Sequence, residues 1–138
     1  MVNPIAFRNN YKTDVPEMDQ EHVCIVDGMN EVSHLVISDN MVDATSKLLE
    51  IRALMLEHFA HEEALMEEID YKPLPYHKCQ HEEILAELDK LLDPQDKDRF
   101  VWTPEDVNRS FVEHVNSYDR DYMDTHKKWL AQNEKSKE

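Results

Sequence analysis

The segments His58-Phe59-Ala60-His61-Glu62-Glu63 and His77-Lys78-Cys79-Gln80-His81 decide the fold of this chain. Residues four apart lie about one turn apart on the same face of an α-helix. His58 therefore pairs with Glu62, and the two histidines of the second segment pair in the same way. The spacing predicts two helices, each presenting a chelating pair of side chains.

Both pairs interrupt apolar stripes with spacings of three and four, which are typical of helices that face a core. The first stripe is Leu48, Ile51, Met55, His58, Glu62, Leu65 and Ile69. The second stripe is Leu74, His77, His81, Ile84, Leu88 and Leu91. A buried carboxylate without a partner would take up a proton, because its charged form is costly in an apolar core. A bound metal cation is the simplest way to keep such a group charged.

The length and net charge of the chain limit the number of domains and the kinds of partner that it can have. The chain has 138 residues, enough for one domain with a single core. Its net charge of -15 argues against nucleic acid and anionic membranes as partners, because both bind basic surfaces. No apolar run reaches the roughly 18 residues of a membrane span, and the start, Met1-Val2-Asn3-Pro4, does not resemble a secretory signal. We expect a cytoplasmic protein that does not insert into membranes.

Glycine and cysteine usage narrows the fold class. The single glycine, Gly28, excludes glycine-rich phosphate loops and most tight hairpins. Strand-like alternation never persists beyond a few residues, so the chain is predicted to be all-α. Cys24 and Cys79 form no CxxC pair and fall within predicted helices, where we expect reduced, partly buried thiols.

The boundary residues predict four helices. The first begins after Asp19, which can cap free amides, and ends near Val36. The second spans residues 41–68, and the third ends near residue 92. Thr103-Pro104-Glu105-Asp106 opens the fourth, with a capping threonine, proline at the first helical position and acids in the first turn.

Four amphipathic helices with short connections predict an antiparallel up-down four-helix bundle, which we assign to residues 18–131. The fourth helix should end near Leu130. Residues 1–17 contain turn formers and no helical stripe, so we expect an extended N-terminal arm. Residues 132–138 are highly charged and are predicted to be a tail or a linker.

Each predicted helix carries a histidine on its core face. Four such histidines together favour a metal site over four unrelated core histidines. Imidazole and carboxylate ligands without a thiolate set fit iron, zinc or copper. More than four ligands are available, so two metals are expected. A ferritin-like site needs two Glu-x-x-His motifs, and only Glu31-Val32-Ser33-His34 matches, which disfavours that arrangement.

In order along the chain, these motifs resemble a hemerythrin domain. The family pattern is a histidine early in the first helix, HxxxE within an HFxxEE segment, HxxxH, and a histidine followed five residues later by aspartate. The chain enters the pattern at Met18-Asp19-Gln20-Glu21-His22. The seven matching positions are His22, His58, Glu62, His77, His81, His114 and Asp119.

The resemblance implies a non-haem centre of two iron ions with an oxo or hydroxo bridge. One iron would be held by three histidines, namely His77, His81 and His114. The other would be held by two histidines, namely His22 and His58. The carboxylates Glu62 and Asp119 would bridge the two. O2 or small anions should bind at the iron with fewer histidines.

The last motif conflicts with regular helix geometry. His114 and Asp119 are five residues apart, or about 140° around a regular helix. A π-bulge or local unwinding near Tyr118 would bring both side chains inward. On a straight helix, Asp121 would be the better aligned carboxylate, and it stays open as the alternative. The resemblance favours Asp119.

Other residues match no family role or depart from the pattern. His34, His61 and His126 match none, and His61 is expected at the surface. Many family members have tryptophan and leucine just before the last histidine, where this chain has Ser110 and Phe111 near the expected O2 pocket. A small polar residue at position 110 would admit water, which predicts a short-lived oxygen adduct.

Three functions follow. The first is an oxygen- or redox-sensing input module, acting on a partner or on a fused signalling output domain, with the chain then being part of a larger protein. The second is a stand-alone reversible O2 carrier or store. The third is a peroxide-consuming enzyme, which we rank last because no added acid or base motif marks a substrate pocket. We expect a binding domain and not an enzyme.

Overall fold

The fold is that of a computed structural model, and the structure describes residues 16–93 and 103–136. Nearly all of the predicted N-terminal arm, residues 1–17, lies outside the described residues. Every element within the described ranges is helical, so the all-α prediction is confirmed there. No described helix is long and apolar enough to cross a membrane.

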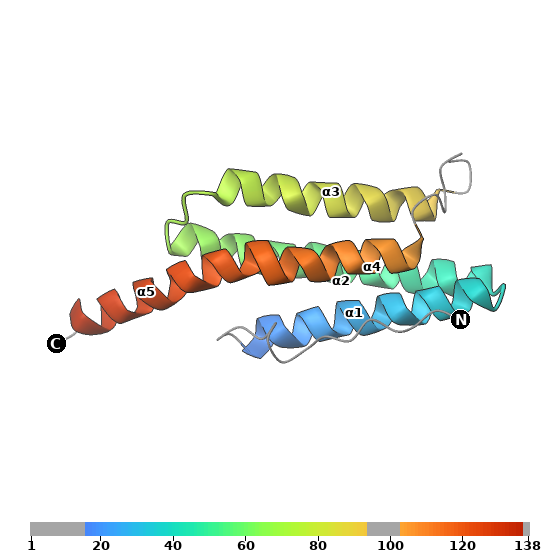
Figure 1. The fold of residues 1–138 in the computed structure, drawn as a ribbon, viewed down its shortest axis with the longest axis horizontal. Coiled ribbons are helices and arrows are strands. Elements are labelled where there is room, and N and C mark those ends of the chain that lie inside the picture. Colours follow the sequence, from blue (N-terminus) through green and yellow to red (C-terminus); the bar gives the residue numbers. More distant parts are fainter. Residues whose placement is uncertain (1–15, 94–102, 137–138) are drawn as a thin grey trace.

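The helices pack side by side as a bundle (Figure 1). Their bounds are α1 Pro16–Ile37, α2 Met41–Glu68, α3 Leu74–Leu92, α4 Pro104–His114, the π-helical turn η2 Val115–Asp119, and α5 Arg120–Ser136. α4, η2 and α5 follow one another without a break and form one long helical rod. Both α1 and α3 pack against α2 and against α4. In Figure 1, the direction of the chain alternates from α1 to α2, to α3 and to the rod.

Two helix ends differ from the prediction. α1 begins at Pro16 and not after Asp19, because proline suits a first helical turn and the acids Glu17 and Asp19 then lie near the positive end of the helix dipole. α5 continues to Ser136, past the predicted end at Leu130. The residues after Leu130 include alanine, glutamine, glutamate and lysine, which are good helix formers. The end of α5 extends beyond the other helices (Figure 1).

Side-chain caps fix the starts of two helices. Asn40 caps α2, its side-chain oxygen accepting from the Asp43 amide at 3.3 Å. Thr103 caps α4 as predicted: its hydroxyl accepts from the Asp106 amide at 3.2 Å, and the Asp106 carboxylate accepts from the Thr103 amide at 3.0 Å. Such reciprocal caps satisfy amides that the first turn of a helix leaves free.

Two apolar clusters form the core. The larger one is built from α1, α2, α3 and α4 and includes Phe59 and Phe111. The smaller one includes Met66, Tyr71 and Tyr122. Along α2 the pair His58 and Glu62 falls between Met55 of the larger cluster and Met66 of the smaller one. Apolar side chains therefore lie on both sides of the polar centre.

The expectation that the two thiols are partly buried is wrong. Cys24 and Cys79 are free, as expected, but both are exposed. Each lies two residues after an inward-facing histidine, which places it about 200° around the helix from the core face. Cys24 instead accepts a hydrogen bond from the Gln20 amide group at 3.4 Å.

Candidate metal centre

The seven residues of the sequence pattern come together in the bundle core, and none is more than 3% exposed. Each of the three long helices α1, α2 and α3 contributes at least one of them, and the α4–η2 rod contributes the rest. These residues are His22, His58, Glu62, His77, His81, His114 and Asp119.

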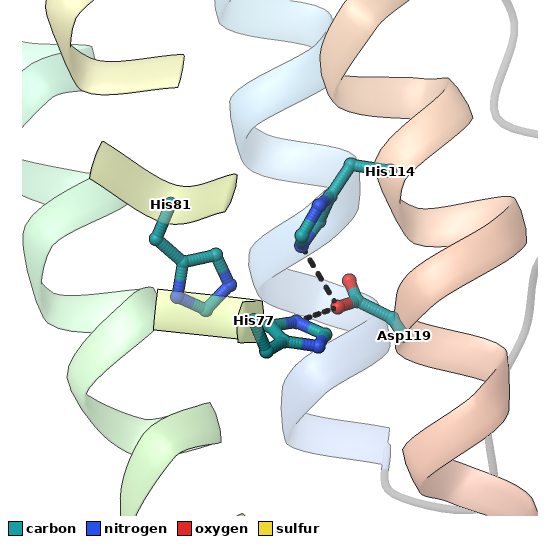
Figure 2. Close-up of side chains that lie close together, drawn as sticks. All are labelled: His77, His81, His114 and Asp119. Atoms are coloured by element: carbon teal, nitrogen blue, oxygen red, sulfur yellow. Dashed lines mark hydrogen bonds and ion pairs between the residues drawn. The ribbon is translucent and has the colours of Figure 1, made fainter. Parts of the chain in front are cut away.

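Three histidines and one aspartate form the first group, shown in Figure 2. Its members are His77, His81, His114 and Asp119. The Oδ1 of Asp119 lies 2.9 Å from the Nε2 of His77 and 3.1 Å from the Nε2 of His114. One candidate ligand atom from each residue lies within 4.8 Å of those of the others, so the group could hold a metal ion.

Two histidines and two carboxylates form the second group, whose members are His22, His58, Glu62 and Asp119. The Nε2 of His22 lies 3.4 Å from the Oδ2 of Asp119 and 3.9 Å from the Oε1 of Glu62. The Nε2 of His58 contacts the same Glu62 oxygen. Asp119 belongs to both groups and offers a different oxygen to each, as a carboxylate that bridges two metals would do.

A π-helical turn brings Asp119 into this position, as predicted from the five-residue spacing. The turn spans Val115–Asp119, directly after His114. The wider turn compensates for the rotation of about 140° that a regular helix would impose. Asp121, the alternative carboxylate, is exposed and accepts a hydrogen bond from the Tyr71 hydroxyl, away from both groups.

Comparison with known families indicates a cation-binding domain, in agreement with the geometry of the two groups. A sequence model described as the hemerythrin HHE cation binding domain matches residues 13–125. The chain belongs to the hemerythrin family. A bacteriohemerythrin from Clostridium acetobutylicum is 25% identical over 128 residues, which span 86% of this chain and 98% of the relative. No solved structure matches the chain significantly.

Glu21 supports the second group of this hemerythrin domain, and the sequence analysis missed it. Its Oε1 lies 2.7 Å from the Nδ1 of His58, and its Oε2 lies 2.7 Å from the Nδ1 of the exposed His61. A carboxylate on the outer nitrogen of a ligand histidine fixes the ring orientation and raises its basicity. Glu63 takes the same position toward His81, with its Oε2 3.4 Å from the Nδ1.

Burial and charge set the protonation of the metal-free centre. Burial lowers the pKa of His22, but hydrogen bonds to Asp119 and Glu62 outweigh it and raise this pKa to about 9. Burial and the charge of Asp119 raise the pKa of Glu62, but His58 and His22 outweigh them and lower it to about 2. Burial disfavours the charged form of Asp119 as well, yet His114 and two other histidines hold its pKa well below the usual range.

His81 differs, because burial and the neighbouring histidines lower its pKa to about 3. Near neutral pH the metal-free centre therefore holds charged carboxylates, a protonated His22 and a neutral His81. A metal cation that binds there would displace the proton of His22. It could bind His81 directly, because His81 is already neutral.

Unsatisfied buried atoms fit a metal. Within the part of the chain that the structure describes, the Nε2 of His81 and the Oε2 of Glu62 are buried and accept or donate no hydrogen bond. Buried polar atoms normally have partners, and each exception calls for an explanation. A cation bound between the side chains would supply the partner. Imidazole nitrogen and carboxylate oxygen are ligands that iron accepts.

Ser110 and Phe111 lie on different sides of the centre. Phe111 is fully buried, and its ring centroid lies 5.9 Å from that of His22 and 6.2 Å from that of His58. Ser110 instead lines a surface cavity of about 290 Å³ between α3 and α4, which His114 also lines. Because neighbouring residues on a helix point about 100° apart, the two side chains face different histidine groups.

The remaining histidines stay outside both groups. His34 and His61 are exposed. His126 is buried on α5 and stacks against Trp129, with ring centroids 6.3 Å apart. None of the three belongs to a described cluster that could hold a metal, in agreement with the sequence analysis.

Proposed function

We propose that this hemerythrin domain binds two iron ions with an oxo or hydroxo bridge and that it senses O2 or redox state. The observation that carries the proposal is the pair of buried four-residue groups that share Asp119. Iron bound there would supply the electrons with which O2 is taken up. We also propose a cytoplasmic location and a binding role in place of catalysis.

The seven residues would divide between the two ions. Three histidines would hold one iron, namely His77, His81 and His114. Two would hold the other, namely His22 and His58, and the carboxylates Glu62 and Asp119 would bridge. The side with two histidines has fewer protein ligands, which leaves room there for O2 or a small anion. Phe111 packs beside these two rings and keeps water away from them.

A sensing role is supported by the helix that carries the shared ligand. His114 and Asp119 lie on the α4–η2–α5 rod, whose end extends beyond the bundle (Figure 1). A π turn contains one residue more than an α turn, so we propose that the rod can switch between two registers at Asp119. If the state of the iron favoured one of them, the end of α5 would transmit it to a partner or fused output domain.

A stand-alone O2 carrier or store is the second candidate. The length of the relative named bacteriohemerythrin supports a stand-alone domain. The match covers 98% of that protein, which leaves no room in it for a second domain. A peroxide-consuming enzyme is the third candidate and has less support. The two carboxylates behind the proposed ligands, Glu21 and Glu63, each contact a ligand histidine, so they orient ligands instead of serving as a separate acid or base.

The test measures metal content and the reaction with O2. The purified protein should contain two irons per chain. After anaerobic reduction, mixing with oxygenated buffer in a stopped-flow spectrometer should give a brief oxygenated absorption band and then the oxidised spectrum. A band that persists and bleaches under vacuum would overturn the sensor proposal in favour of the carrier. A protein that takes up no iron would overturn both.

A further inference from the structure

The outward face of α2 carries an uncharged stripe. Three large apolar side chains recur there at seven-residue intervals, and small residues separate them. The members, which we call the α2 stripe, are Val42, Ser46, Leu49, Ala53, Leu56 and Ala60. All six are exposed, and Val42, Leu49 and Leu56 are exposed by 78%, 57% and 45%. A regular seven-residue repeat of this kind is the pattern of a helix that packs against another helix.

Nothing in the described bundle covers this face. At 100° per residue the α2 stripe lies within about 40° of one line along the helix, opposite the buried residues Ile51, Met55 and His58. The helices that pack on α2 are α1 and α3. The stripe contains no ionisable group, although the chain has a net charge of -15. An exposed stripe that carries no charge and is apolar at five of its six positions indicates an interaction site on an otherwise charged protein.

We propose that the α2 stripe binds the α2 stripe of a second copy of this chain, with the two helices antiparallel about a two-fold axis that crosses the stripe midway between Leu49 and Ala53. The axis would place Leu49 opposite Ala53 of the second copy, Leu56 opposite Ser46, and Val42 opposite Ala60. Each large side chain then meets a small one, so the surface is complementary to itself, as a two-fold interface requires.

The charges along one edge of the stripe set the strength of the pairing. Asp43, Glu50 and Glu57 form an acidic row about 60° to 100° from its centre line. An antiparallel two-fold axis brings this row beside the same row of the second copy, and like charges repel. Salt screens that repulsion, so the dimer tightens as ionic strength rises. A parallel pair would instead place Glu57 beside Arg52 of the second copy, and salt would weaken it.

The size of the stripe indicates a weak dimer. From position 42 to position 60 the helix rises about 27 Å, and a helix is about 10 Å wide, so a stripe-to-stripe contact buries roughly 500 Å² in total. Stable interfaces bury at least about 1,200 Å². We therefore expect a reversible dimer that forms at high protein concentration and dissociates on dilution.

Sedimentation velocity of the full metal-loaded chain, over a wide range of concentrations and at low and high salt, tests the proposal. The expected result is a monomer–dimer equilibrium whose Kd falls as salt rises. Leu49→Glu, next to the two-fold axis, should raise Kd by at least about tenfold. Val42→Glu should have the smaller effect, although Val42 is the more exposed residue, because it lies at the end of the contact.

The matched control is Leu130→Glu, which changes a 39% exposed leucine on α5 and should leave Kd unchanged. Helical content and iron content should be the same in all variants. A monomer at every concentration overturns the proposal. So does a dimer that salt weakens, or one that Leu130→Glu disrupts and Leu49→Glu does not.

Discussion

His114 and Asp119 are five residues apart in sequence, yet the Nε2 of one lies 3.1 Å from the Oδ1 of the other. The contact exists because the helix between them is a π turn. The same Asp119 carboxylate reaches His77 and, through its second oxygen, His22. One irregular turn thus connects ligand residues from three different helices.

Replacing Asp119 should abolish the two-metal site, whereas replacing Asp121 should not. Asp119→Ala removes the one residue that both groups share, so we expect loss of bound iron and of its absorption spectrum. Asp121→Ala removes only the hydrogen bond from Tyr71, which should cost about 1 kcal/mol of stability. Iron analysis of both variants checks this, and an Asp121→Ala protein without iron would support the alternative assignment.

Deleting Ser117 should remove the π turn and preserve the site. Ser117 is exposed and lies within the turn. Without it, the histidine and the aspartate are four residues apart and share a face of a regular α-helix. We expect iron binding to persist and the helix to be regular, as hydrogen exchange of the amides around the deletion would show. If the proposed sensing role uses the π turn, the response of any output partner should be lost.

Deleting Ala86 provides the matched control. This residue is also exposed, but it lies in the regular helix α3. No extra residue is present there to absorb the change, so Leu88 and Leu91 rotate by about 100° out of the core. We expect the free energy of unfolding to fall by several kcal/mol, because removing a buried leucine from a core costs about 2–5 kcal/mol. Equal damage from both deletions would contradict the role of the π turn.

Glu21 should tune the metal affinity through His58. Glu21→Ala leaves His58 without the carboxylate behind it, and loss of such a partner weakens metal binding by about 10- to 100-fold. His61→Ala removes only the exposed contact of the same carboxylate and should change the affinity little. Competition with a chelator measures both. Equal effects would mean that Glu21 acts through His61.

Local periodicity accounts for what the sequence predicted correctly. The four-residue spacing placed His58 with Glu62 and His77 with His81, and the need for an inward Asp119 predicted the π turn. The contact of Glu21 with His58 could not be predicted, since it spans 37 positions in sequence and depends on how α1 packs on α2. The prediction that Ser110 and Phe111 lie at one O2 pocket did not take into account that adjacent residues on a helix point about 100° apart.

Filling the cavity at Ser110 should slow oxidation of the reduced centre. The cavity of about 290 Å³ brings solvent to His114, on the side with three histidines. Ser110→Trp occupies this space, so we expect a severalfold slower autoxidation with unchanged iron content. Ala131→Trp, at an exposed position on α5, is the control. An unchanged rate in Ser110→Trp would mean that water reaches the centre by another route.

The metal-free chain should be most stable near pH 6.5. In the folded state the pKa of Glu62 is lowered to about 2 and that of His81 to about 3. Both groups bind protons more strongly when unfolded, so stability rises with pH up to the unfolded histidine value of 6.5. The pKa of His22 is raised to about 9, so its contribution is complete below pH 6.5 and is lost as pH rises to about 9.

Urea unfolding of the metal-free protein between pH 4 and pH 10, roughly the range these pKa values span, measures this profile. His22→Gln separates the two sides, because it removes the group responsible for the alkaline loss. The variant should keep the rise below pH 6.5, where Glu62 and His81 titrate, and should lose less stability above it. Bound metal should also reduce the loss of stability above pH 6.5, since it displaces the proton of His22. A steady rise in stability from pH 6.5 to pH 9 in the metal-free protein would show that His22 is not held protonated by Asp119 and Glu62.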